Sequence, residues 1–273
     1  MRALRPMLTV TCGLLIAAGS ATAAPVDLND WTAESYPAVA GFGAGVWTVV
    51  PNGSSVTQSV NGQPTLFFSD FNAQGSKVTG TIQVGANAGD DDYIGFVLGF
   101  NPGDATNAGA NYLLIDWKSV TQNFNFGAPS ASPGGLALEG LAVSRVTGIP
   151  DADEFWQHDN LAGTPAGDGL TELARGATLG DVGWTHGTSY DFTFDFGPNN
   201  LQVFVDDVLQ LDIVGAFGNG RMGFYNFSQA DVTYSAFTRD PGSFPGNGVP
   251  EPATLALLGL GLLGLAVARR RRS

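Results

Sequence analysis

The stretch Asp90-Asp91-Asp92-Tyr93-Ile94-Gly95-Phe96-Val97-Leu98-Gly99-Phe100 places three adjacent carboxylates before an apolar run. A second apolar run, Tyr112-Leu113-Leu114-Ile115-Asp116-Trp117-Lys118, follows a segment rich in Gly, Asn and Asp. Such runs, bounded by turn residues, predict two neighbouring antiparallel strands with an acidic loop at one end. Adjacent carboxylates repel one another, so the loop either faces water as a solvated turn or holds a cation. Asp oxygens are ligands that Ca²⁺ prefers, and both interpretations are open at this point.

The segment from residue 24 to residue 239 carries further strand patterns. Residues 77–84 alternate between apolar and polar side chains, which predicts a half-buried strand. Residues 189–196 alternate with four aromatic side chains on one face. Evenly spaced short strands of this kind predict an all-β antiparallel sandwich or jelly roll. Further strands are expected at 136–146, 201–205, 208–213, 220–228 and 232–237.

Some connections between these strands can also be predicted. Residues 28–50 are expected to form a first strand pair, followed by a turn at 51–53. The strands at 55–60 and 65–69 are expected to form a hairpin, joined by the loop at 61–64. The long, weakly periodic segment 119–180 is expected to be functional or to pack as a small substructure of its own. Residues 170–175 within it are consistent with one or two helical turns.

Both ends of the chain carry targeting signals. Residues 1–23 combine two arginines, a short apolar core and the A-x-A site Ala21-Thr22-Ala23, which indicates a secretory signal peptide. Residues 240–248 read as a flexible linker rich in Gly and Pro. The apolar run 253–268, followed by four arginines, predicts a single C-terminal transmembrane helix. By the positive-inside rule the arginines stay cytoplasmic, so the folded part lies outside the membrane.

The tail motif Pro250-Glu251-Pro252, the apolar run and the basic end follow one another in order within residues 249–273. This arrangement closely resembles the PEP-CTERM sorting signal of exported bacterial proteins. The resemblance implies processing by an exosortase, with cleavage near the motif. A plain single-span anchor with a chance Pro-Glu-Pro is the alternative, and its membrane physics is the same.

Charge and cysteine content exclude several function classes. Residues 24–248 contain six Lys and Arg against 24 Asp and Glu, a net charge of −18. Such a surface argues against nucleic acid, whose binding depends on neutralising phosphates, and it attracts cations. The chain has one cysteine, Cys12, and it lies in the signal peptide, so the exported domain has no disulfide and no thiol chemistry.

Five blocks between about residues 70 and 237 resemble the C-terminal lectin-like domain of thrombospondins. These blocks are 90–100, 112–122, 155–158, 183–190 and 220–229. The resemblance implies a concanavalin-like jelly roll that binds Ca²⁺, mediates extracellular adhesion and is not an enzyme. It implies Ca²⁺ ligation by Asp90, Asp91 and Asp92. The upstream calcium-binding repeats and the cysteines of thrombospondins are absent from this sequence, so partner specificity does not carry over.

Other candidate sites have simpler explanations. His158, with Glu154 and Asp159, could mimic a catalytic cluster, and the neighbouring Trp156 could stack on a sugar, but a loop packed on the sandwich is favoured. The strand carboxylates Asp116, Glu139, Asp191 and Asp195 could supply the acid pair of a glycosidase, but they are expected to point to water. Trp117 and Trp184 are expected in the core or at its rim, and Asp206-Asp207 at a hairpin turn. The sequence contains no phosphate loop, H-E-x-x-H or G-x-S-x-G motif.

The sequence therefore predicts an exported, surface-sorted and non-enzymatic β-sandwich that binds Ca²⁺. Its expected role is adhesion, or a place in an extracellular matrix, with polysaccharide or surface proteins as partners. A glycan-binding lectin or a polysaccharide-active enzyme on the same fold is the alternative, because fold alone does not decide function. A structural matrix protein without a ligand is the third possibility.

Overall fold

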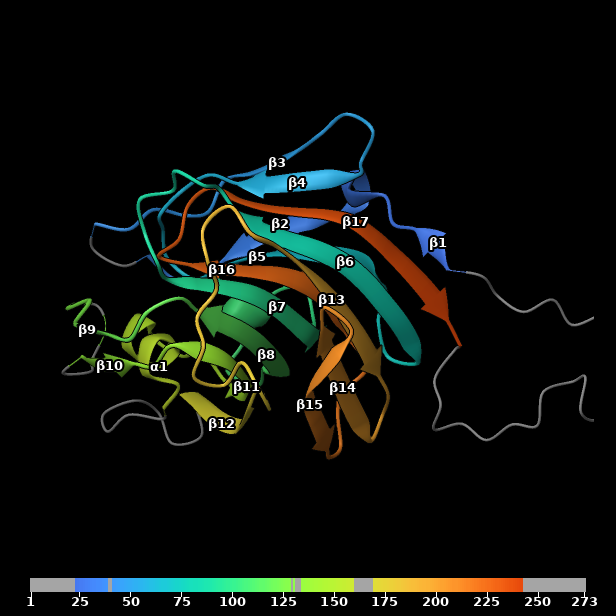
Figure 1. Cartoon of the computed structure of the whole chain (residues 1–273). Coiled ribbons are helices and arrows are strands. Elements are labelled where there is room, and N and C mark those ends of the chain that lie inside the picture. Colours follow the sequence, from blue (N-terminus) through green and yellow to red (C-terminus); the bar gives the residue numbers. More distant parts are fainter. Residues whose placement is uncertain (1–22, 39–40, 129, 131–133, 160–168, 243–273) are drawn as a thin grey trace, which may run out of the picture. The chain divides into compact units, whose positions relative to one another are not determined.

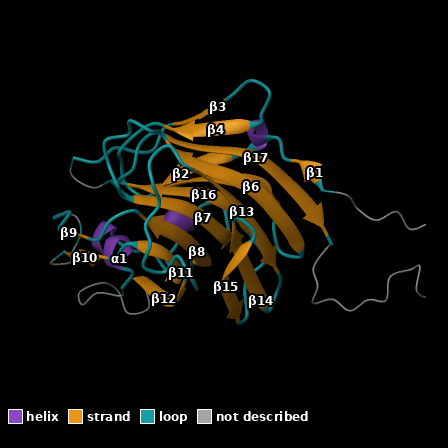
Figure 2. Ribbon diagram, in the orientation of Figure 1, coloured by secondary structure: helices purple, strands orange, loops and turns teal. Residues whose placement is uncertain are grey.

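The computed structural model describes residues 23–242, except for residues 39–40, 129, 131–133 and 160–168. These described residues belong to one compact unit. Its described part is a sandwich of two large antiparallel sheets with very little helix (Figures 1 and 2). The predicted all-β antiparallel sandwich is confirmed.

The first sheet has eight strands, and β1 (Ala24–Pro25) joins it by pairing with β17. Its other strands follow in spatial order: β15 (Val208–Val214), β14 (Asn200–Val205), β13 (Ser189–Phe196), β6 (Ser76–Val84), β17 (Val232–Pro241), β4 (Ser55–Gln58) and β3 (Trp47–Val49). The strands predicted at 77–84, 189–196, 201–205 and 208–213 are therefore confirmed, and the first and second are direct neighbours.

The second sheet has seven strands, and a small two-stranded sheet lies outside both large ones. The seven strands follow in spatial order: β12 (Gly169–Arg175), β11 (Gly140–Thr147), β8 (Asn111–Lys118), β7 (Tyr93–Phe100), β16 (Arg221–Phe227), β5 (Thr65–Asn72) and β2 (Thr32–Ser35). The small sheet and the helices are β9 (Gln122–Phe124), β10 (Gly135–Ala137), α1 (Ala152–Gln157) and the 3₁₀ turns η1 (Leu28–Asp30) and η2 (Asp104–Thr106).

The strands β7 and β8 pair directly, as predicted, and both are buried along nearly their whole length. One face of this pair packs against the first sheet in the main core. The other face packs in a second apolar cluster, which includes residues of α1 and β12. A strand covered on both sides needs apolar side chains at every position, which explains why these two runs lack alternation. By contrast, β6 is covered on one side and alternates in burial from residue to residue.

Aromatic rings join the two sheets across the main core. Phe224 of β16 stacks on Tyr234 of β17 with ring centroids 4.3 Å apart, and it also contacts Phe237 at 4.6 Å. Phe96 of β7 contacts Phe192 and Phe194 of β13 at 4.9 and 4.8 Å. Each such pair buries large apolar area, so these rings hold the layers together.

Two predicted strand pairings are wrong because the chain crosses between the sheets at these points. β2 pairs with β5 in the seven-stranded sheet, whereas β3 pairs with β4 in the eight-stranded sheet, so residues 28–50 do not form a strand pair. The strands β4 and β5 also belong to different sheets, so the segment 61–64 is a connection between layers and not a hairpin. Alternation identifies a strand, but it does not identify the neighbour of that strand.

Segment 119–180 differs from prediction in three places. Residues 170–175 belong to strand β12, because pairing with β11 satisfies their backbone along the strand, whereas two isolated helical turns would bear the cost of helix nucleation for few hydrogen bonds. The predicted strand at 136–146 is two strands, β10 and β11. Residues 152–157 form the helix α1, which was not predicted although the sequence contains its capping box: Asp151 and Glu154 each accept the backbone N–H of the other.

Two of the strand carboxylates are also buried, contrary to prediction. Asp116 is fully buried and Asp195 is nearly so, whereas Asp191 is exposed and Glu139 is intermediate. Trp117 and Trp184 lie in the core as expected. Asp206 and Asp207 form the predicted hairpin turn, and both have left-handed backbone angles.

The predicted signal peptide at 1–23 falls outside the described residues except for Ala23, and the predicted membrane helix at 253–268 falls outside them entirely. Residues 240 and 241 of the predicted linker continue strand β17, and the remainder of the linker is not described beyond Gly242. Within the described part of the chain, no helix has the length and apolar character that crossing a membrane requires.

Candidate functional site

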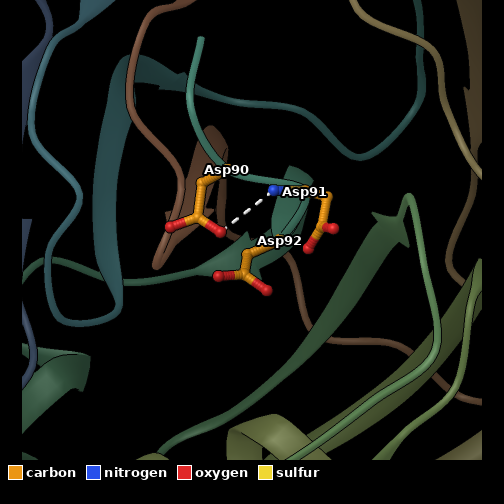
Figure 3. A group of neighbouring side chains, drawn as sticks. All are labelled: Asp90, Asp91 and Asp92. Atoms are coloured by element: carbon orange, nitrogen blue, oxygen red, sulfur yellow. Dashed lines mark hydrogen bonds between the residues drawn. The ribbon is translucent and has the colours of Figure 1, made fainter.

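The acidic loop lies immediately before β7, and β7 pairs with β8 so that Tyr93 faces Lys118. This register brings the last residue of β8 to the three carboxylates of Asp90, Asp91 and Asp92, which Figure 3 shows side by side. One ligand oxygen of each lies within 4.8 Å of those of the other two. The structure therefore gathers all three predicted metal ligands into one cluster.

Asp92 is anchored through its backbone by two distant segments. Its N–H donates to the side chain of Gln229 at 2.9 Å, and its carbonyl accepts from the indole N–H of Trp184 at 3.0 Å. Gln229 follows β16, and Trp184 precedes β13. Two of the sequence blocks that resemble thrombospondins thus meet at the acidic loop and hold its last residue in place.

The side chain of Asp92 is buried and pairs with the ammonium group of Lys118, with Nζ and Oδ1 2.5 Å apart. Lys118 is fully buried and also donates to Gln122 Oε1 at 2.6 Å and to the Asp91 carbonyl at 3.3 Å. Its Nζ lies 4.4 Å from the ring centroid of Trp156, which adds a cation–π contact. Burial raises the pKa of Asp92 to about 7, against the opposing influence of the Lys118 charge.

The other two carboxylates are more accessible. Asp90 accepts hydrogen bonds from the side chain of Asn61 and from the backbone N–H of Asp91, and its own carbonyl contacts the ring of His186 at 2.7 Å. The Oδ1 atom of Asp91 is shielded from solvent and has no hydrogen-bond partner among the described residues; Lys118 Nζ lies 3.8 Å from it.

These contacts are compatible with a bound calcium ion. With all three carboxylates ionised, the cluster and the ammonium of Lys118 together carry a net charge of −2, which a divalent cation would neutralise. The buried oxygen of Asp91 lacks a partner, and a buried carboxylate oxygen without one is costly. Because Asp92 Oδ1 is already engaged by Lys118, Asp90 and Asp91 are better placed than Asp92 to be the main ligands.

A pocket of about 180 Å³ opens beside the loop. It is lined by Phe42, Asn61, Asp90, Asp92, Gln122, Asn123, Phe124, Trp156 and Ser228. The strand β9 thus brings part of the long segment 119–180 to the acidic loop. Three of the residues at this site, Lys118, Asn61 and Gln122, are not among those predicted from the sequence. The one signal in the sequence that could have identified Lys118 is its position at the end of an apolar strand. A lysine in such a place is buried only when its ammonium group is paired with an acceptor.

His158 does not form the cluster that its sequence neighbours suggested. Its Nε2 lies 2.9 Å from Oδ2 of the buried Asp116, and its Nδ1 lies 3.2 Å from Oε2 of Glu172, which also pairs with Arg175 at 2.9 Å. These contacts tie α1 to β8 and β12. Carboxylates engage both ring nitrogens, so His158 is not positioned to activate a nucleophile.

The His158 contacts predict a pH-dependent stability. Burial lowers the pKa of His158, but Asp116 and Glu172 outweigh burial and raise it from 6.5 to about 9. The stabilisation is therefore fully present below about pH 6.5 and is lost as the pH rises through about 9. We expect the free energy of unfolding to fall by roughly 2–3 kcal/mol across this window, as measured by urea denaturation.

The matched control for this prediction is the other histidine of the chain. His158→Gln should remove most of this alkaline loss of stability, whereas His186→Gln leaves the pairs with Asp116 and Glu172 in place and should retain it. An equal alkaline loss in wild type and His158→Gln would contradict the assignment.

The fold and the site together define the class of this protein, an all-β sandwich domain with a candidate binding site in the loops beside β7 and β9. The thrombospondin C-terminal region family matches residues 43–240, and the chain belongs to this family. The PEP-CTERM protein-sorting motif matches residues 248–272. Both resemblances stated from the sequence are confirmed. The two matches point to an exported, surface-associated protein, and the sorting motif implies processing by an exosortase.

Among known proteins, the chain is 25% identical to thrombospondin-3b of Danio rerio over 202 residues, which covers 69% of this chain and 20% of that protein. It is 23% identical to the cartilage oligomeric matrix protein of Rattus norvegicus, covering 69% of this chain and 24% of that protein. The chain thus spans about a fifth of the length of the first of these relatives. The carbohydrate binding module CBM66 from Bacillus subtilis superposes with a TM-score of 0.48 at 10% identity, covering 77% of this chain and 95% of that one. A likeness at that TM-score supports no functional conclusion.

Proposed function

We propose that the protein is a non-enzymatic binding module of the cell surface or extracellular matrix that binds Ca²⁺ through Asp90, Asp91 and Asp92. The observation that carries this proposal is the cluster of three carboxylates within 4.8 Å, with a shielded Asp91 oxygen that lacks a hydrogen-bond partner among the described residues. Membership of the thrombospondin C-terminal family and the sorting motif support a role in adhesion. The membrane helix at 253–268 would anchor the chain until an exosortase acts near Pro250-Glu251-Pro252.

Each residue of the cluster has a distinct part in this proposal. Asp90 would hold the ion through its carboxylate and Asp91 through the shielded Oδ1 that lacks a hydrogen-bond partner among the described residues, and Asp92 would offer Oδ2 while its Oδ1 stays paired with Lys118. The ion would neutralise the repulsion between these carboxylates. Because Trp184 and Gln229 fix the end of the loop, ligand binding would stabilise a conformation that is already largely built.

Calcium is expected to raise the melting temperature of the protein. A ligand that binds only the folded state stabilises it as its concentration passes its Kd, by about 2.7 kcal/mol at 100 times Kd. For a domain of this size the shift is roughly 5–10 °C. We would record melts of the full chain in calcium and in chelator, and repeat them with Asp90→Asn and Asp91→Asn combined, which should abolish the shift.

The hairpin turn at Asp206 and Asp207 provides a matched control. Changing both to Asn removes the same charge, and Asn tolerates their left-handed backbone angles. This control should keep the full calcium shift. If wild type shows no shift, or if the control loses it as completely as the site variant, calcium does not bind at this loop and the cluster is a solvated turn.

Glycan binding is the second candidate function. The pocket beside the acidic loop combines amide, carboxylate and aromatic side chains, which is the lining that a polar, ring-shaped ligand requires. An adhesion module with such a pocket would contact extracellular polysaccharide directly. The glycan-binding hypothesis requires no catalytic residues. This agrees with the contacts of His158, whose two ring nitrogens are already paired with Asp116 and Glu172.

A further inference from the structure

We propose that the pocket between β9 and the acidic loop binds a neutral saccharide. Its volume of about 180 Å³ suits one sugar unit of a longer chain. The inference rests on the proposed surface location, which exposes the pocket to extracellular polysaccharide. It does not require calcium, because amides and aromatic rings supply most of the lining.

The polar part of the lining matches sugar hydroxyl groups, each of which both donates and accepts hydrogen bonds. Amides offer one donor group and one acceptor group, and carboxylates offer acceptors. Gln122 uses its Oε1 to accept from Lys118, so its Nε2 points away from that bond and remains a donor. Neither this Nε2 nor the side-chain amide of Asn123 has a hydrogen-bond partner within the described part of the chain. The pocket therefore carries hydrogen-bonding groups that the protein itself leaves unused.

The apolar part of the lining suits the C–H face of a sugar ring. Phe124 is 43% exposed, which is unusual for a ring held in contact with Phe126 at 4.7 Å and with Phe42 at 6.3 Å. Trp156 lies at the buried side of the same pocket, fixed by Lys118 and Phe126. An aromatic ring that is held by its neighbours and still accessible gives a ligand apolar contact at a small entropic cost.

Charge restricts the saccharide to an uncharged one. The pocket contains Asp90 and Asp92, and the nearby cation Lys118 is fully buried and already paired with Asp92. A uronic acid or a sulfated sugar would meet uncompensated negative charge, which disfavours binding. A basic peptide is the other occupant that an acidic pocket would suit. The unused amides of Gln122 and Asn123 and the exposed ring of Phe124 favour hydroxyl groups and a C–H face over the ammonium groups of such a peptide.

The test is affinity electrophoresis of the full chain through gels that contain dextran, mannan or galactan, all uncharged polymers. A detergent without a sugar headgroup keeps the tail soluble, and chelator removes calcium from every measurement. We expect at least one of the three polymers to retard the protein. Alginate, a polyuronic acid, should not retard it. Oligolysine added to the gel as a competitor should not release it.

Two substitutions on β9 and its partner strand locate the site. Phe124→Ala should weaken the retarding polymer's apparent Kd at least about tenfold, as expected for a central aromatic contact. Leu136→Ala is the matched control, because Leu136 is 49% exposed on β10 and does not line the pocket. Circular dichroism would establish that both variants remain folded.

Three results would overturn the inference: no retardation by any of the three neutral polymers, preferential binding of alginate or oligolysine, or equal affinity of wild type and Phe124→Ala. The calcium melts answer a separate question. Retardation in chelator without a calcium shift refutes the calcium site alone, and a calcium shift without retardation refutes the saccharide pocket alone.

Discussion

Replacing Lys118 with Met is expected to destabilise the protein by about 3–5 kcal/mol, because it leaves the buried carboxylate of Asp92 without its counter-charge. The substitution also removes the donor that satisfies Gln122 Oε1 and the Asp91 carbonyl. Methionine has nearly the same length and would still pack against Trp156, so lost packing contributes little. Urea denaturation of wild type and variant measures the difference.

Two further variants separate the effect of charge from the effect of size. The double variant Lys118→Met with Asp92→Asn should recover a large part of the loss, since it removes both charges together. Lys77→Met is the comparison at the other lysine of the domain: its side chain is 42% exposed and its Nζ lies 3.7 Å from Oδ2 of the nearly buried Asp195, so solvent screening of the ammonium should keep its cost well below that of Lys118→Met. A loss below about 1 kcal/mol for Lys118→Met would show that the pair contributes little to stability.

Replacing Phe224 with Ala is expected to cost about 3–5 kcal/mol, as is usual for deletion of a fully buried aromatic ring. The ring stacks on Tyr234 at 4.3 Å and contacts Trp31 at 4.7 Å, so its loss opens a cavity between the two sheets. Surrounding rings are held by their own neighbours and can collapse into this space only in part. Urea denaturation would report the loss as a lower midpoint.

Phe124→Ala is the control for this second prediction. It deletes the same atoms from a ring that is 43% exposed, so its effect on the free energy of unfolding should stay below about 1 kcal/mol. Equal losses for the two variants would mean that the interface between the sheets does not depend on Phe224. The same Phe124 variant tests saccharide binding, so its stability must be known in any case.

The local sequence pattern was sufficient to predict the positions of most of the strands. The alternation of residues 77–84 and of 189–196 identified β6 and β13, and the unbroken apolar runs identified β7 and β8. A strand that is covered on one face alternates between apolar and polar residues, and a strand that is covered on both faces is apolar throughout. The residues of each segment are therefore enough to predict it. The capping box of α1 is equally local, but it lies in a weakly periodic segment with no apolar pattern to indicate a helix.

The local sequence pattern did not predict which strands pair with each other or which charged side chains form ion pairs. Asp116 looks like any strand carboxylate, yet α1 and β12 bring His158 and Glu172 to the same place and bury it. Lys118 looks like a strand end facing water, yet the register with β7 sets it against Asp92. Both pairings join segments that are tens of residues apart in the chain. No property of either segment alone specifies its partner.

The sequence by itself determined that this protein is a β-sandwich of the thrombospondin C-terminal family that carries a PEP-CTERM sorting motif, and these matches point to export. Export signals and strand periodicity are local features, and the family blocks are runs of adjacent residues. The tertiary structure alone decided that Asp92 pairs with a buried lysine, that Trp184 and Gln229 hold the acidic loop, and that β9 forms a pocket beside it. The physical reason is that the cost of burying a charge and the value of an open pocket depend on which distant side chains the fold brings into contact.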